Sequence, residues 1–445
     1  MKINNKLLCA LTLVAAAFFL NGCSSGDDNG DNSTDDGNTT PVTINSTIKL
    51  TDTPIGYASL GTSYTTSGTP VTVTTKAELL SAVSNGGVII IDGMIDMSYD
   101  STYGGSLMPT TAGGTNDYLD AFVKAKTSSA YSTYTAFKTA YAESCSSTTN
   151  DKSSSSPEST LGSTLWKLNS AYGNIIKLTI KSNTTLIGKS AGCGIKGGTV
   201  SLSSVSNVII RNLTIQDAYD PFPHHEKDDG FNAQQDCIVI QGSCKNIWID
   251  HCTLQDTLGV SKVTTSSGSE KWQTYDGLCD IKNESTNITV SNCKFNNHDK
   301  TMLIGSSDED GDNAVRFVTL YANYFYNCGQ RLPMVRNTKI HILNNYYDAS
   351  NPTYTQSYAV GCRQDCIVYA ENNWFGSGIK YSFKDSYGSL YSSGNTDKSS
   401  SGCNTSVTGS TLFSTLNKYS YTPLSASDAK TYVTANAGAG CTLGE

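Results

Sequence analysis

The sequence has no excess of positive charge, no thiolate metal motif and few signals for β-hairpins. Lys and Arg number 31 against 39 Asp and Glu, which gives a formal net charge of −8 at pH 7. This balance excludes a nucleic-acid partner, because such binding depends on cations that neutralise phosphates. No Cys-x-x-Cys pair occurs and the five histidines are scattered, which argues against a zinc site. An anionic ligand would therefore need cations that are gathered locally.

The N-terminal apolar run, residues 7–20, is too short for a comfortable membrane span. Two lysines precede it, as in a secretory signal. Residues 20–23, Leu-Asn-Gly-Cys, resemble a bacterial lipobox, whose cysteine becomes the lipidated first residue of the mature protein. We expect residues 1–22 to be a lipoprotein signal peptide and Cys23 to carry the lipid. An ordinary cleaved signal, with Cys23 incidental, is the alternative.

Residues 23–41 are rich in Ser, Gly, Asp and Asn and contain almost nothing apolar. Such a segment cannot bury a core, so it is expected to be a flexible tether. Its acidic start resembles the surface-export signals of lipoproteins in the Bacteroides group. The resemblance implies anchoring in the outer membrane, facing outward. The folded domain is then expected at residues 42–445.

Short strand-like runs rich in β-branched residues and Asn recur along the rest of the chain. They can be aligned at residues 207–215, 246–254, 287–295, 317–325, 339–347 and 367–375. Repeats of this kind indicate a solenoid whose turns stack on one another. A sandwich would need hairpin turns such as Asn-Gly between the runs, and these are scarce. We therefore predict an all-β fold, a right-handed parallel β-helix, and a monomer.

One position of the alignment is occupied by residues that can stack along the solenoid. It reads Leu213, Cys252, Cys293, Asn323, Asn345 and Asn373. Equivalent side chains on successive turns lie about 4.8 Å apart, so the amides can form a hydrogen-bonded ladder. The same spacing puts Cys252 and Cys293 within reach of a disulfide. Twelve cysteines remain after Cys9 and Cys23 are set aside, and buried free thiols are the alternative for them.

Three helical features are expected around the solenoid. Thr75 and Glu78 form a capping box that opens a helix toward Val83, and this helix would cap one end of the stack. Residues 98–163 differ in composition and are expected to be an insertion, with a helical stretch at residues 118–143. A last helix is expected to open near Ser425 and to pack on the side of the solenoid.

Two further segments are expected to be loops. Residues 258–275 make one turn longer than its neighbours, and their Trp272 and Tyr275 are expected either to contact sugar rings or to pack within the loop. His224 and His225 lie in a segment that is expected to be a solvated loop. A metal or substrate contact there is the alternative.

Acidic and basic residues converge in the second half of the chain. Asp276 and Asp280 are an even number of residues apart, so on a strand both point to one face. Asp236 begins the preceding run, and three such carboxylates call for a counter-ion. Calcium takes ligands of this kind and can also hold a substrate carboxylate. With Lys300 nearby, the set suits removal of a proton next to a carboxylate, as in a polymer of uronic acid.

The same residues carry a family resemblance. Residues 248–251 (Trp-Ile-Asp-His), residues 276–282, Lys300 and residues 331–336 (Arg-Leu-Pro-Met-Val-Arg) resemble, in order, the signature blocks of the pectate lyase family of polysaccharide lyases. The resemblance implies that His251 is a structural residue.

The resemblance also implies roles in the site. Asp236, Asp276 and Asp280 would be calcium ligands. Lys300 and Arg331 would bind the substrate carboxylate and remove the proton at C5, and Arg336 would hold substrate. These roles are implied by the family blocks alone.

The function that follows is calcium-dependent β-elimination of polygalacturonate, which gives 4,5-unsaturated oligogalacturonates. Three alternatives remain. A pectin lyase would act on methyl-esterified chains without the calcium ligands. A hydrolase on the same fold would use an acid pair to activate water. A non-catalytic surface β-helix would only bind pectin.

Overall fold

The computed structural model describes residues 46–61, 64–309, 316–384, 387–396, 400–401 and 419–444. The predicted signal peptide at residues 1–22, the predicted lipid site Cys23 and the predicted tether at residues 23–41 lie outside the described residues. Within them, no helix is long and apolar enough to cross a membrane.

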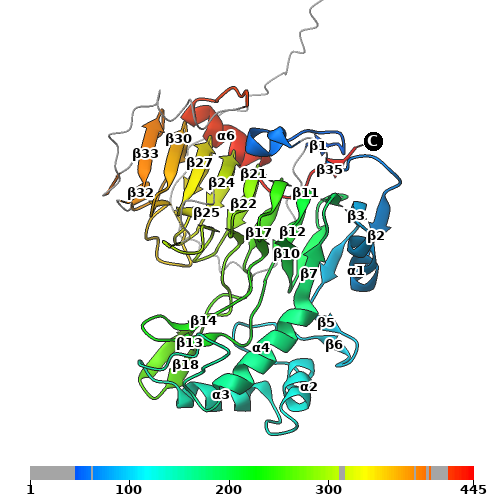
Figure 1. Cartoon of the computed structure of the whole chain (residues 1–445), viewed down its shortest axis with the longest axis vertical. Helices are drawn as coiled ribbons and strands as arrows, with labels where there is room; N and C mark the ends of the chain where they lie inside the picture. The colour runs from blue at the N-terminus through cyan, green and yellow to red at the C-terminus, as the bar shows by residue number, and fades with distance from the viewer. Residues whose placement is uncertain are drawn as a thin grey trace, which may run out of the picture. The chain divides into compact units, whose positions relative to one another are not determined.

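Most described strands belong to three parallel sheets, of nine, ten and eight strands (Figure 1). In order across the nine-stranded sheet, they are β34 (Ser400–Ser401), β32 (Phe383–Lys384), β29 (Val360–Cys362), β26 (Met334–Val335), β23 (Leu303–Ile304), β20 (Cys279–Ile281), β15 (Ile238–Gln241), β10 (Thr199–Ser203) and β7 (Lys177–Ile180). The ten-stranded sheet contains β2 (Val71–Val73), β3 (Gly87–Ile91), β8 (Thr184–Gly188), β11 (Ser206–Arg211), β16 (Lys245–Asp250), β21 (Thr286–Ser291), β24 (Arg316–Tyr321), β27 (Thr338–Leu343), β30 (Ile367–Glu371) and β33 (Ser389–Ser393). The eight-stranded sheet contains β31 (Trp374–Phe375), β28 (Tyr346–Asp348), β25 (Tyr324–Tyr326), β22 (Lys294–Asn296), β17 (Thr253–Gln255), β12 (Thr214–Gln216), β9 (Gly194–Lys196) and β4 (Met94–Asp96).

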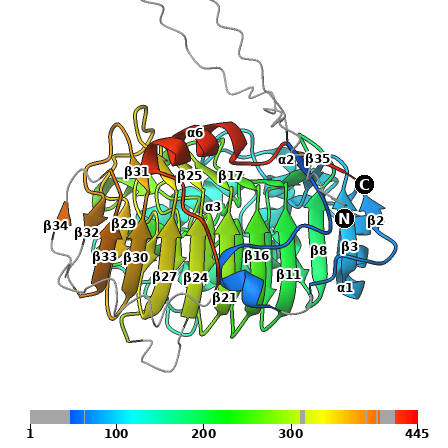
Figure 2. The same ribbon diagram turned by 90° about the horizontal axis from the view of Figure 1, so that it is seen from above.

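Each turn of the chain adds one strand to each of these sheets. The strands β15, β16 and β17 make one turn, and β20, β21 and β22 make the next. Figure 2 shows the strands of the ten-stranded sheet side by side. Apolar residues stack in register inside the coil, as Ile247 does on Ile288 and Ile288 on Val318. The predicted parallel β-helix is therefore confirmed.

The predicted asparagine ladder is also confirmed. The amide nitrogen of Asn323 donates to Oδ1 of Asn345 at 2.9 Å, and that of Asn345 donates to Oδ1 of Asn373 at 3.0 Å. The ladder continues from Asn373 to Asn395 at 2.8 Å. All of these amides except that of Asn395 are fully buried, so each satisfies its neighbour where water cannot.

The predicted Cys252–Cys293 disulfide is wrong. All cysteines in the described part of the chain are free and buried. Cys252 and Cys293 lie on adjacent turns, but their thiols form hydrogen bonds with backbone carbonyls. The Cys252 thiol donates to the Ile210 carbonyl at 3.6 Å, and the Cys293 thiol donates to the Ser291 carbonyl at 3.2 Å. The backbone N–H of Cys293 donates to Oδ1 of Asn323 at 2.9 Å. The two thiols therefore continue the ladder toward the N-terminus as weaker hydrogen-bonding groups.

The N-terminal cap follows the prediction closely. Helix α1 (Lys76–Asn85) starts at Thr75, whose side chain accepts a hydrogen bond from the Glu78 N–H, while Glu78 bonds back to the Thr75 N–H. Gly86 ends the helix at φ 75°, a conformation that glycine adopts without strain. A 3₁₀ helix, η1 (Gly56–Leu60), precedes it, and β1 (Thr47–Ile48) pairs with β35 (Thr442–Leu443).

The predicted insertion contains more helix than expected. The helical stretch at residues 118–143 is two helices, α2 (Asp117–Lys126) and α3 (Tyr134–Ser144), separated by Ser128 and Ser129 with φ of 53° and 66°. A third helix, α4 (Gly162–Ile176), runs into β7 and was not predicted. A small antiparallel pair, β5 (Tyr99–Asp100) and β6 (Gly105–Ser106), completes this region.

The segment expected to be a long loop belongs to the same region. It forms β18 (Ser261–Thr265) and β19 (Gly268–Trp272), which join β13 (His224–Glu226) and β14 (Gly230–Asn232) in a four-stranded sheet. Trp272 packs with Phe231 and with the insertion aromatics, and it is 1% exposed. Tyr275 is buried as well, so the packing alternative holds for both aromatic residues.

The prediction of a solvated segment at His224 and His225 is wrong, because both side chains are buried in this second core. The ring of His224 lies 3.6 Å from that of Trp166. His225 contacts the Thr149 carbonyl at 2.9 Å. The insertion covers what would otherwise be an exposed hairpin.

The last helix, α6 (Ala426–Asn436), opens at Ser425, whose hydroxyl accepts a hydrogen bond from the Asp428 N–H. Its Val433 packs against Ala322 and Tyr346 on the side of the solenoid (Figure 2). This arrangement confirms the prediction for the C-terminal helix.

Candidate active site

The predicted site residues lie at the starts of four neighbouring strands of the nine-stranded sheet, β15, β20, β23 and β26. Asp236 precedes β15, Asp276 precedes β20 and Asp280 lies within it. Lys300 precedes β23 and Arg331 precedes β26, and a parallel bridge between Lys300 and Gln330 sets these two turns in register. The solenoid thus brings together residues that are nearly a hundred positions apart in the sequence.

Two carboxylates converge at the centre of the site. Asp236 and Asp280 are both buried. Asp236 accepts a hydrogen bond from the Gly277 N–H at 2.8 Å, and Asp280 accepts one from the Leu303 N–H at 3.0 Å. A Cβ at Gly277 would lie 2.4 Å from one Asp280 oxygen and 2.8 Å from one Asp236 oxygen. Only glycine therefore leaves room for the pair.

A third residue, Lys282, bridges this pair and was given no role in the sequence analysis. Its Nζ lies 3.2 Å from Oδ2 of Asp236 and 3.0 Å from Oδ2 of Asp280. Burial and then the nearby Asp280 carboxylate raise the pKa of Asp236. Burial alone would lower the pKa of Lys282, but the two carboxylates raise it above its usual value. The even spacing from Asp280 to Lys282 is the sequence signal that could have found it.

Asp276 pairs with Lys300 instead. Its Oδ1 lies 2.9 Å from the Lys300 ammonium, which also donates to Oδ1 of Asn232 at 3.3 Å. Burial alone would raise the pKa of Asp276, but Lys300 and, more weakly, Lys282 and Arg331 bring it below its usual value. Burial opposes the charge on Lys300, yet Asp276 raises the pKa of its ammonium. The site therefore holds one group of two carboxylates that share Lys282 and, beside it, the Asp276–Lys300 pair.

The described side chains form no group of three or more potential metal ligands within coordination range. Asp236 and Asp280 share Lys282, whereas Asp276 contacts Lys300. The charge of Asp276 also raises the pKa values of Asp236 and Lys282. The available donors are all carboxylate oxygens, which is the ligand type that calcium prefers. The chemistry of the pair, its burial and its recruitment of the Lys282 ammonium fit a hard cation.

The two predicted arginines differ in their surroundings. Arg331 has a φ of 59°, and its guanidinium has no hydrogen-bond or ion-pair partner in the described part of the chain. Arg336 follows β26, beyond the cis peptide between Leu332 and Pro333. Its Nε lies 2.5 Å from Oδ1 of Asp308. Arg331 is thus free to meet a ligand, whereas Arg336 is tied to a neighbouring carboxylate.

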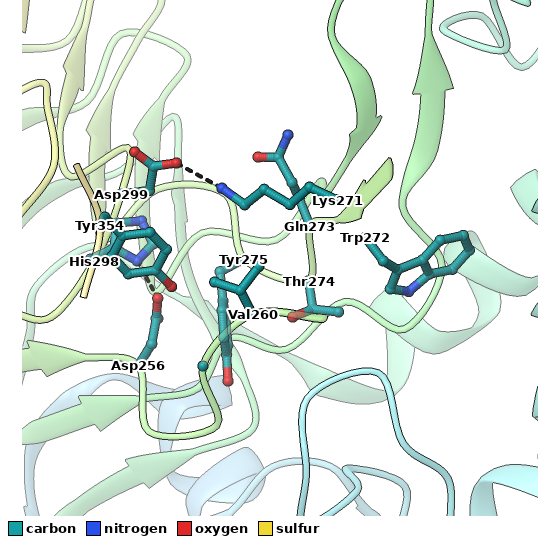
Figure 3. Close-up of a pocket in the computed structure, with 11 residues that line it drawn as sticks. Asp256, Val260, Lys271, Trp272, Gln273, Thr274, Tyr275, His298, Asp299 and Tyr354 are labelled. Carbon is teal, nitrogen blue, oxygen red and sulfur yellow. Dashed lines mark hydrogen bonds and ion pairs between the residues drawn. The ribbon is translucent and has the colours of Figure 1, made fainter. Parts of the chain in front are cut away.

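A buried histidine, His298, lies next to Asp256 in a neighbouring pocket (Figure 3). His298 Nδ1 lies 2.5 Å from Oδ2 of Asp256, and its Nε2 donates to the Asp276 carbonyl at 2.7 Å. Burial alone would lower the pKa of His298, but the Asp256 carboxylate raises it. Beside it, the Lys271 ammonium lies 2.8 Å from Asp299. His298 thereby fixes the backbone that carries Asp276.

The block at residues 248–251 lies on the ten-stranded sheet and has structural contacts. Asp250 binds Arg211 at 2.9 Å and His251 Nδ1 at 2.7 Å. The Trp248 indole donates to Ser291 at 2.9 Å. These contacts join adjacent turns, which agrees with the structural role expected for His251.

Comparison with known proteins identifies relatives of this chain. A family model described as pectate lyase matches residues 174–442, a span that contains all six predicted site residues. Pectate lyase E of Dickeya dadantii (strain 3937) is 41% identical over 204 residues, which cover 45% of this chain and 50% of that protein. The chain spans about half the length of the curated relatives it matches.

Two solved structures resemble the fold over most of its length. The pectate lyase from Acidovorax avenae subsp. citrulli is 24% identical with a TM-score of 0.69, and the match covers 93% of this chain and 99% of that one. A pectate lyase bound to a hexasaccharide is 27% identical with a TM-score of 0.61, and the match covers 92% and 99%.

Proposed function

Because the chain belongs to the pectate lyase family, we propose that it cleaves polygalacturonate by β-elimination and releases 4,5-unsaturated oligogalacturonates. The observation that carries the proposal is the position of Lys300 and the unpaired Arg331 on adjacent turns, beside two buried carboxylates. A solved relative that is bound to a hexasaccharide supports a polymeric sugar as substrate.

In the proposed reaction the Lys300 ammonium binds the uronate carboxylate, which makes the C5 proton more acidic. Arg331 takes this proton as the general base. The electron pair of the C5–H bond then forms the C4–C5 double bond, and the glycosidic oxygen at C4 leaves with the electrons of the C4–O bond and takes a proton from water. Arg336 would also bind the substrate, and its ion pair with Asp308 would break when it does so.

We propose that Asp236, Asp280 and Asp276 hold a calcium ion during the reaction. When bound, calcium supplies positive charge that neutralises the substrate carboxylate. The Lys282 ammonium offsets part of the negative charge of Asp236 and Asp280.

The proposal is tested by the ultraviolet absorbance of polygalacturonate mixed with the protein, first with added calcium and then with a chelator. Absorbance that grows with calcium and stops with chelator supports elimination and the metal together. A rise in reducing ends without absorbance would instead indicate a hydrolase.

Replacement of Arg331 separates catalysis from binding. We expect Arg331→Ala to lower kcat by about 10²-fold or more, as loss of a general base does, while retardation of the protein in gels that contain polygalacturonate persists. Full activity in this variant would contradict the role of Arg331.

A second candidate is elimination without calcium, on methyl-esterified pectin. It is favoured by Lys282, whose ammonium already lies between the two carboxylates. Absorbance that grows on methyl-esterified pectin and is unaffected by chelator would support it.

We also propose that residues 1–22 are removed, that Cys23 anchors the protein in the outer membrane, and that residues 23–41 tether the domain at the cell surface. The lipobox-like sequence supports this location. Labelling with a radioactive fatty acid tests it, since Cys23→Ala should abolish the label.

A further inference from the structure

Helix α4 leads directly into β7 (Figure 1). A groove with both polar and apolar lining runs along the exposed face of this helix. Its volume is about 760 Å³. Its walls include Trp166, Lys167, Ser170 and Asn174 from α4, Lys177 at the start of β7, and Gln235 from the loop before β15. Most of α4 precedes residues 174–442, the span that matches the pectate lyase family model.

The groove continues the outer surface that carries the active site. In the register of the nine-stranded sheet, Thr179 aligns with Ser201, Ser201 with Val239 and Val239 with Asp280. Lys177 lies two residues before Thr179, and both are exposed on that outer face. Strands β7 and β20 are three strand spacings apart, or about 14 Å.

The charge of the groove is opposite to that of the whole protein. Lys167 and Lys177 are both exposed, and neither has an ion-pair partner among the described residues. None of the described residues that line the groove is acidic, whereas the chain carries a net charge of −8. Two unpaired ammonium groups in an acidic protein select an anionic ligand.

The remaining lining suits a sugar. The Trp166 indole donates to the Asp151 carbonyl at 2.9 Å, and its ring rests on His224, so the half-exposed ring is held in place. A fixed aromatic surface with polar groups around it is a common way to bind a ligand that is both apolar and polar. Ser170 and Asn174 supply hydrogen-bonding groups on the same helix face.

We propose that the groove along α4 binds further galacturonate residues of the polymer chain that the active site cleaves, beyond the turn of Asp236. The inference rests on the proposed function. It makes the protein prefer long, de-esterified chains, because only these reach Lys167 and Lys177 with free carboxylates.

The test compares polygalacturonate with tetragalacturonate as substrates for the double variant Lys167→Gln/Lys177→Gln. Exposed ion pairs are individually weak, so we expect the ratio of the KM for the polymer to the KM for the tetramer to rise about fivefold. The matched control is Lys124→Gln/Lys245→Gln, which removes two exposed lysines outside the groove and should leave that ratio unchanged. An equal ratio in the double variant and the wild type would overturn the proposal.

A separate measurement keeps the inference apart from the proposed reaction. If the wild type releases no product, the proposed function fails, and retardation in gels that contain polygalacturonate then tests the groove alone. Weaker retardation of Lys167→Gln/Lys177→Gln than of the control supports the groove, and equal retardation overturns it.

Discussion

At the scale of single residues, the site depends on how buried charges are paired. Asp236 and Asp280 lie in a space that Gly277 leaves open, and Lys282 provides the only ammonium that the described residues place against both. The sequence predicted the carboxylates through their spacing. The sequence could not predict the ion pair between Asp276 and Lys300, because these residues lie in loops that belong to two different turns of the solenoid.

Replacement of Lys282 by Met is expected to destabilise the protein in the presence of chelator by about 3–5 kcal/mol, since it leaves two buried carboxylates without their cation. Added calcium should restore much of this loss if the pair binds the ion. Thermal unfolding of wild type and variant, each with calcium and with chelator, measures both effects. Equal melting temperatures of the two proteins in chelator would contradict the role given to Lys282.

His224 predicts a dependence of stability on pH. Burial lowers the pKa of His224 to about 4, whereas in the unfolded chain it is about 6.5. Below pH 6.5 the unfolded chain binds a proton that the folded protein excludes, so stability falls from pH 6.5 to about pH 4. The loss amounts to about 3 kcal/mol.

Urea unfolding at pH 7 and at pH 4.5 tests this expectation, with His224→Gln as the comparison. Glutamine cannot titrate in this range. The free energy of unfolding should therefore fall less in the variant between pH 7 and pH 4.5, and the difference should be most of the loss of about 3 kcal/mol. An identical fall in both proteins would assign the pH dependence to other groups.

At the scale of helices and strands, the sequence predicted the elements that are marked by a local motif or a repeated pattern. The capping box at Thr75 and the repeating strand runs led to α1 and to the solenoid. Helix α4 was missed because it contains Gly162, Gly173 and several Ser and Asn residues, which are poor helix formers. It is stabilised instead by packing of Leu165, Leu168, Tyr172 and Ile176 in the second core.

The same core explains why residues 258–275, which were expected to be a loop, contain the hairpin β18–β19. Trp272 is buried because the insertion, more than a hundred residues earlier in the chain, covers the hairpin β18–β19. Neither segment shows a period that would pair it with the other. Long-range packing of this kind is absent from local patterns.

The asparagine ladder gives a prediction at this scale. Asn345→Ala removes hydrogen bonds to Asn323, Asn373 and the Leu320 carbonyl, and it leaves buried polar groups unpaired. We expect a loss of about 2–4 kcal/mol in the free energy of unfolding. Asn345→Cys should lose less, because Cys252 and Cys293 occupy equivalent positions on earlier turns.

Denaturant unfolding of the two variants measures this difference. Equal losses for Ala and Cys would show that the thiol does not replace the amide in the ladder. A loss within error of zero for Asn345→Ala would contradict a stabilising ladder altogether.

At the scale of the whole molecule, an acidic protein presents cations along one sheet edge. Arg331, Lys300 and Lys282 lie on successive turns toward the N-terminus, and Lys177 lies three strands further along. The solenoid makes this possible, because each turn moves the chain by one strand spacing and returns it to the same face. Family membership and this line of charge are consistent with the proposed cleavage of an anionic polysaccharide.

The most direct test of the central claim is mass spectrometry of the products formed from polygalacturonate in water labelled with oxygen-18. Elimination leaves each new non-reducing end one water lighter than a saturated oligomer, and cleavage itself brings in no label. We expect these unsaturated products. Saturated oligomers that carry one labelled oxygen per cleavage would contradict it and would make the protein a hydrolase.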